Sequence, residues 1–202
     1  MLTKTEGGDM KTLTNKVQVL FLICLTMMTM WHYNKISQTT TPNLNLQISQ
    51  FTKEARREIY CLAENIYFEA GHEPTLGKYA VAFVTQNRVD KGFADSICGV
   101  VKQKTYHSSG KVVCQFSWWC EDKPKFISTN NLLTNGANPV YNEALKLAIY
   151  FYTNHDNLKD PTNGALFYHA DYVNPNWSFA KKEITIGRHI FYNYKRNPNE
   201  RL

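Results

Sequence analysis

Two stretches with helical periodicity follow each other closely between residues 52 and 91, and they restrict the fold strongly. Thr52 can cap the first stretch and Gly71 can end it. The second stretch, LGKYAVAFVTQNRV, follows Pro74 and ends near Gly92. The sequence therefore predicts a helical hairpin. Its apolar positions are Ala55, Ile59, Leu62, Ile66 and Ala70 in the first helix, and Leu76, Ala80, Phe83 and Val84, expected on one side, in the second.

A third helix and two short strands are expected further along the chain. Asn138 and Pro139 begin the helical segment VYNEALKLAIYFY, with proline suited to the first helical position. The segments ALFYHA and ITIGRHIFYNY are aromatic and β-branched, which is typical of strands. Residues 92–138 are predicted to be irregular and to carry binding groups, because so long a connection is rarely passive. The expected fold class is α+β, mainly helical with a small β-sheet.

The N-terminal fifty residues differ from the rest. A basic segment, residues 1–16, precedes an apolar run over 17–31, which is typical of a signal-anchor or transmembrane segment. The first alanine is Ala55, so no small-residue cleavage site follows the run. We expect residues 1–16 to be cytoplasmic, 17–31 to anchor in the inner membrane, 32–50 to form a polar linker, and 51–202 to form the folded domain. A buried core helix over 17–31 is the alternative.

Charge and cysteine content narrow the function classes. The net charge of +6 is spread along the chain, which disfavours nucleic-acid binding and suits a polyanionic partner such as a bacterial envelope.

The cysteines are consistent with export. Cys24 lies in the apolar run, which leaves four cysteines in the part expected to be exported, where disulfides are plausible in any of three pairings. The loop between Cys114 and Cys120 is the easiest to close. A zinc site is disfavoured because no C-x-x-C pair is present. The four cysteines are Cys61, Cys98, Cys114 and Cys120.

Glu69 interrupts the apolar stripe of the first helix. It lies three residues after Ile66 and seven after Leu62, so its carboxyl shares their face and points to the core or to the edge of a cleft. Partial burial and the negative end of the helix dipole both raise a carboxyl pKa above about 4.3. Such a group can protonate a poor leaving group. The alternative is a structural glutamate that binds backbone or pairs with Arg88.

Other acidic residues nearby have simpler interpretations. Glu64 is rotated away from Glu69 and is expected to be solvated, and Glu73 is a candidate cap for the second helix. His72 with its acidic neighbours does not form a metal-binding pattern, so we expect no metal and no cofactor.

Six blocks in order resemble the SleB-type cell-wall hydrolase family, over about residues 58–194. They are AENIYFEAGHEPTLGKYAVAFVTQNRV, ICGVVKQ, CQFSWWC, DPTNGALFYHA, NPNW and IGRHIFY. The resemblance implies a lysozyme-like domain that cleaves the MurNAc–GlcNAc backbone of peptidoglycan, with Glu69 as catalytic acid/base. It also implies that Gln115, Phe116, Ser117 and Trp118, together with Tyr168 and His169, line the glycan cleft. The chain departs from the family pattern at Gly71 and His72, which replace an arginine and a glycine.

The reaction depends on how many carboxylates act. No second carboxylate lies on the motif helix, which favours a lytic transglycosylase that uses the MurNAc C6 hydroxyl. A muramidase-type hydrolase would recruit Asp90, Asp95 or Asp122.

About half of the aromatic residues Trp118, Trp119, Tyr168 and Trp177 are expected to stack on sugars. His189 is interpreted as a strand residue. We therefore predict an exported, membrane-tethered enzyme that binds peptidoglycan glycan strands, such as a phage-type endolysin. A non-catalytic wall-binding module is the second class.

Overall fold

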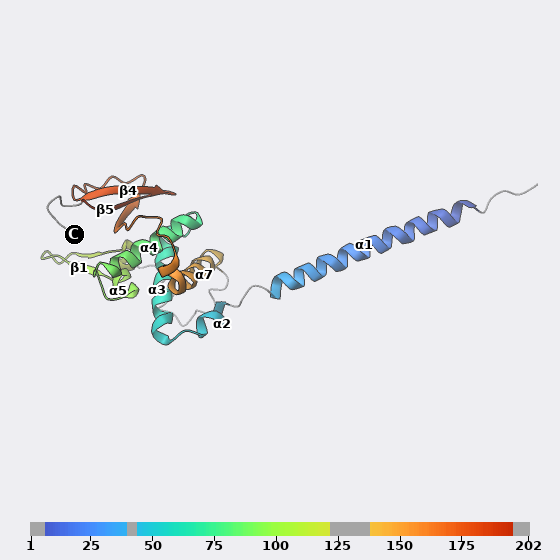
Figure 1. Cartoon of the computed structure of the whole chain (residues 1–202), viewed down its shortest axis with the longest axis horizontal. Helices are drawn as coiled ribbons and strands as arrows, with labels where there is room; N and C mark the ends of the chain where they lie inside the picture. The colour runs from blue at the N-terminus through green and yellow to red at the C-terminus, as the bar shows by residue number, and fades with distance from the viewer. Residues whose placement is uncertain (1–6, 40–43, 122–137, 196–202) are drawn as a thin grey trace, which may run out of the picture. The chain divides into compact units, whose positions relative to one another are not determined.

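The computed structural model describes residues 7–39, 44–121 and 138–195 (Figure 1). The chain divides into two units, with the second starting at Ile48. The first unit contains the 33-residue helix α1, Gly7–Thr39. Its large apolar side chains between Val17 and Trp31 are exposed. Among the described residues, no helix combines the length and the apolar character needed to cross a membrane.

The predicted linker over residues 32–50 contains helical structure. Helix α1 continues to Thr39, and a short helix α2 covers Leu44–Ser49. Ile48 is 5% exposed and belongs to the core of the second unit. The compact unit therefore begins before Phe51, because an apolar residue of the predicted linker is needed to close the core.

The predicted helical hairpin is present. Helix α3 spans Lys53–Ala70 and begins at the cap Thr52, whose hydroxyl accepts the backbone N–H of Ala55 at 3.1 Å. Helix α4 spans Thr75–Asp90. Helix α7, Pro139–Asn154, packs along α3 and is capped by the Asn138 side chain, as predicted. A short helix α5, Ile97–Val101, covers another side of α3.

Helix α4 lies between the helical core and the sheet (Figure 1). Ala82 and Phe83 face the helices, whereas Ala80 and Val84 pack on the sheet. The prediction that its apolar residues occupy one side was therefore wrong, and Leu76 is 54% exposed. A helix covered on two faces has little amphipathic periodicity, which explains the error.

The sheet has three antiparallel strands in the order β3-β5-β4. They are β3, Phe167–Ala170, β4, Ala180–Ile186, and β5, His189–Tyr194. The segment predicted as one strand, residues 184–194, is a hairpin whose two-residue turn contains Gly187 at φ 56°. Strands β1, Lys104–Tyr106, and β2, Val112–Cys114, form a second hairpin in the segment predicted to be irregular.

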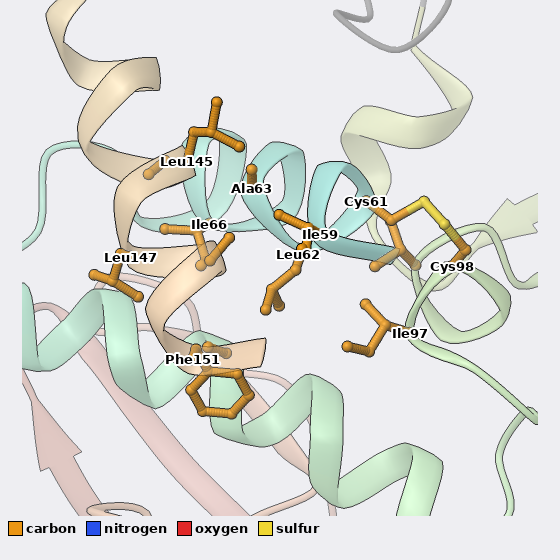
Figure 2. Close-up of a cluster of buried hydrophobic side chains, with 14 of the residues drawn as sticks. Ile59, Cys61, Leu62, Ala63, Ile66, Ile97, Cys98, Leu145, Leu147 and Phe151 are labelled. Atoms are coloured by element: carbon orange, nitrogen blue, oxygen red, sulfur yellow. A yellow bond between two sulfur atoms is a disulfide. The ribbon is translucent and has the colours of Figure 1, made fainter. Parts of the chain in front are cut away.

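The core of the second unit surrounds α3. Leu62 and Ile66 are fully buried, and Phe151 of α7 contacts Phe83 edge to face at 4.9 Å between ring centroids. Figure 2 shows this cluster, with a disulfide joining α3 to α5 at one end. The four cysteines outside α1 form the pairs Cys61–Cys98 and Cys114–Cys120.

Candidate active site

Glu69 lies in the last turn of α3, and its half-buried side chain lines a pocket of about 190 Å³. The Tyr168 hydroxyl, on β3, donates a hydrogen bond to Glu69 Oε2 at 3.1 Å. Burial and the neighbouring negative charge of Glu69 raise the pKa of Tyr168 well above its ordinary value. Tyr168 therefore remains a protonated donor at neutral pH and orients the carboxyl.

Arg88, in the last turn of α4, connects this helix to the residue before β3 and to the segment after β2. It is 3% exposed, and its Nε donates to the Leu166 backbone oxygen at 2.7 Å. With the Gln115 amide oxygen turned towards it, both Nη atoms donate to that oxygen at 3.2 Å. Its guanidinium also lies 5.1 Å from the Phe116 ring centroid. Burial lowers the pKa of Arg88, whereas the nearby Tyr168 and Glu69 raise it. The guanidinium of Arg88 remains charged at neutral pH.

The pocket walls come from two further segments. Gln115, Phe116 and Ser117 follow β2, and the Cys114–Cys120 disulfide closes their loop. Phe167 and Trp177 also line the pocket, with ring centroids 6.0 Å apart. Among the described residues, the pocket lining thus combines one carboxyl and one cation with aromatic surface, the mixture of apolar walls and a few polar groups that is typical of ligand pockets.

The structure brings together most of the residues expected to line a cleft. Glu69 and Tyr168 meet there with the Q-F-S segment, residues 115–117. Trp118 does not: it is 2% exposed, stacks on Phe68 at 4.6 Å and donates its indole N–H to Asn65. It was wrongly predicted to line the cleft, because buried polar partners hold it in the core.

The pocket lining differs from the expected cleft at His169 and Phe167. His169 lies outside the pocket, where its ring nitrogens contact the Ala170 backbone oxygen at 2.8 Å and the Tyr192 hydroxyl at 2.9 Å. Phe167 lines the pocket but was not identified from the sequence. Its position next to Tyr168 in the FYHA block was the sequence feature that could have indicated a place in the pocket.

The other acidic residues lie away from the pocket or outside the described chain. Glu64, expected to be solvated, is fully buried, because α3 is covered on several sides. Glu73 does not cap α4; its Oε2 accepts the Arg188 backbone N–H at 3.0 Å. Asp90 and Asp95 are exposed and absent from the pocket lining, and Asp122 lies outside the described residues.

The turn after α3 leaves little room for a side chain at Gly71. A Cβ atom there would lie 2.5 Å from the Tyr67 backbone oxygen and 3.1 Å from Val140 Cγ1. A larger residue would require the turn to shift away from α7. In the part of the chain that the structure describes, no three His, Cys, Asp or Glu side chains gather as metal ligands would.

Comparison with known proteins identifies the family. A family model described as Cell Wall Hydrolase matches residues 72–192, starting three residues after Glu69. The catalytic domain of the germination-specific lytic transglycosylase SleB from Bacillus anthracis is 25% identical, with a TM-score of 0.44, covering 71% of this chain and 97% of its own. The catalytic domain of the Bacillus cereus SleB protein is also 25% identical, with a TM-score of 0.41, covering 68% and 91%. No curated protein matches. The family model matches more than half of this chain. The chain therefore belongs to the cell wall hydrolase family and is an enzyme that acts on peptidoglycan.

Proposed function

We propose that this enzyme cleaves the glycan backbone of peptidoglycan between MurNAc and GlcNAc as a lytic transglycosylase, with Glu69 as its single acid/base. The observation that carries the proposal is the position of Glu69. Among the described residues that line the pocket, it provides the one carboxyl group, and Tyr168 holds it at 3.1 Å.

The chemistry needs two proton transfers at one carboxyl. Glu69 first gives its proton to the glycosidic oxygen while the bond from MurNAc C1 to that oxygen breaks. The resulting carboxylate then takes the proton from the MurNAc C6 hydroxyl, and the C6 oxygen bonds to C1. A 1,6-anhydro ring forms, and Glu69 is protonated again without consuming water. Two-carboxylate hydrolysis needs a partner about 5–9 Å away, and no other carboxyl lies among the described lining residues.

Glu69→Gln tests the assignment. Removing general acid/base catalysis should lower the rate by roughly 10²–10⁴-fold. Glu54→Gln is the matched control, because Glu54 is exposed in the first turn of the same helix. Clearing of cell walls in a gel should persist in this control and disappear in Glu69→Gln. Equal clearing by both variants would remove Glu69 from the mechanism.

Product analysis separates the two reactions. Mass spectrometry of the released muropeptides should show anhydro ends, whereas reducing ends would establish the muramidase-type hydrolase. The non-catalytic alternative, motivated by the altered turn at Gly71, requires wild-type protein that binds walls but does not clear them.

We further propose that the enzyme acts outside the cytoplasm, where its substrate lies. Its two disulfides support this location, since disulfides persist in oxidising compartments. Thiol labelling of protein taken directly from cells tests the proposal. Protection of Cys61, Cys98, Cys114 and Cys120 is expected, and four free thiols would contradict it.

A further inference from the structure

One face of the three-stranded sheet carries an unusual number of aromatic rings. In the register of the sheet, Phe167 lies opposite Tyr192, and Tyr194 is two residues further along β5 on the same side. The other side, with Phe191, packs on α4. Trp177 and Phe179 extend the aromatic side just before β4. We call this set the aromatic face: Phe167, Trp177, Phe179, Tyr192 and Tyr194.

The aromatic face is continuous with the pocket. Phe167 lines the pocket and also contacts Phe179 at 5.3 Å and Tyr194 at 5.1 Å between ring centroids. Trp177, which lines the pocket too, lies 6.2 Å from Phe179. A chain that leaves the pocket on this side therefore meets the next rings within about one sugar length.

The outer rings are exposed although they are strongly apolar. Phe179 is 45% exposed and Tyr194 is 52% exposed, with their centroids 6.0 Å apart. Adjacent exposed aromatic side chains next to a binding pocket are typical of an interaction surface. The C–H faces of pyranose rings are apolar and flat, so they can pack on such rings.

A positive charge borders the aromatic face. Lys182 is exposed and directly opposite Tyr192 in the register, and a bulge after it returns Ile184 to the inner side. MurNAc carries a lactyl carboxylate or a stem peptide, so an ammonium beside the rings suits this polymer better than a neutral polysaccharide.

We propose that the aromatic face binds further sugars of the same peptidoglycan strand, beyond those in the pocket, with Lys182 facing their carboxylates. This inference rests on the proposed function and extends it. The enzyme would then prefer long glycan strands to short fragments.

The test measures binding in the Glu69→Gln background, so that the ligand stays intact. Calorimetry compares a GlcNAc–MurNAc tetrasaccharide with an octasaccharide of the same repeat. The octasaccharide should bind at least about tenfold more tightly, which corresponds to about 1.4 kcal/mol. Phe179→Ala with Tyr194→Ala should remove most of this gain. Tyr150→Ala is the control, because Tyr150 is 48% exposed on α7, outside the aromatic face.

Lys182→Ala gives an independent measurement at an exposed position. It should weaken binding of the octasaccharide about threefold at low salt and leave a neutral GlcNAc octamer unaffected. If the double alanine variant loses its fold by circular dichroism, Phe179→Leu with Tyr194→Leu keeps apolar volume and should still remove most of the gain.

The outcomes separate the two proposals. Equal affinity for both lengths, or a gain that survives in a folded double variant, would overturn the inference while wall clearing by the wild type still supports the proposed function. Absence of clearing by the wild type would overturn the proposed function, whatever the binding data show.

Discussion

Replacing the buried guanidinium of Arg88 should both destabilise the protein and loosen the pocket. Arg88→Met has similar length but no donors. It leaves the Leu166 backbone oxygen, in a residue 1% exposed, without its 2.7 Å charged donor. A hydrogen bond from a charged donor contributes about 1.5–3 kcal/mol, and the contact with the Phe116 ring adds about 0.5–1 kcal/mol. We therefore expect the free energy of unfolding to fall by about 2–4 kcal/mol.

Urea denaturation followed by circular dichroism measures this change. Arg57→Met is the control, since Arg57 is exposed on α3 and should change stability by less than about 0.5 kcal/mol. A double-mutant cycle with Gln115→Ala isolates the contact between the two side chains and should give a coupling energy of about 1 kcal/mol. Arg88→Lys keeps the charge but not the forked geometry, and should lie between wild type and Arg88→Met.

Activity of the folded variants completes the experiment. If Arg88 holds the Q-F-S segment against the pocket, Arg88→Met should clear walls more slowly under conditions where it is fully folded. A stability loss below about 1 kcal/mol, together with wild-type clearing, would refute the anchoring role.

Two further predictions concern the pocket loop and acid stability. Cys114→Ser with Cys120→Ser opens a loop with a sequence separation of 6, which should lower the free energy of unfolding by about 2 kcal/mol, measured by urea denaturation. Dithiothreitol should slow the clearing of cell walls by the wild type. An unaffected rate would contradict a role for this disulfide. Burial lowers the pKa of His189 below 6.5, although the negative charges of Glu73 and Asp171 partly oppose this shift. As the pH falls, His189 therefore takes up a proton in the unfolded chain before it does so in the folded protein. The free energy of unfolding is unaffected by this group above about pH 6.5 and decreases as the pH falls below that value. His189→Gln should flatten the decline between pH 7 and 5, measured by urea midpoints, whereas an unchanged slope would exclude His189 as its source.

The elements that could be predicted from the sequence are those with local signals. The cap at Thr52, the start at Asn138 and the end at Ala70 each depend on residues within one helical turn. The hairpin over residues 184–194 carried a local signal too, since Gly187 supports a tight two-residue turn, but the continuous apolar pattern concealed it.

The orientation of side chains in the pocket loop depends on distant partners. Trp118 turns inward because its indole N–H reaches Asn65, which in turn bonds Thr85 of α4. Trp118 lies in the four-residue helix α6, Ser117–Cys120, which is too short for its periodicity to reveal this choice. Glu64 is another case, because its burial depends on how closely neighbouring helices cover α3. The position of Glu69 at the pocket could be predicted because its helix face and the family resemblance point to the same residue.

The division of the site between a rigid frame and a short exposed hairpin has an evolutionary consequence. Glu69 and Arg88 sit on helices whose inner faces build the core, so mutations near them carry a high stability penalty. Strands β1 and β2, by contrast, are mostly exposed, and the Q-F-S segment follows directly from them. Insertions or exchanges in this hairpin should therefore cost less stability than changes in α3 or α4, so the wall of the pocket formed by the Q-F-S segment is the part that sequence change can reshape most easily.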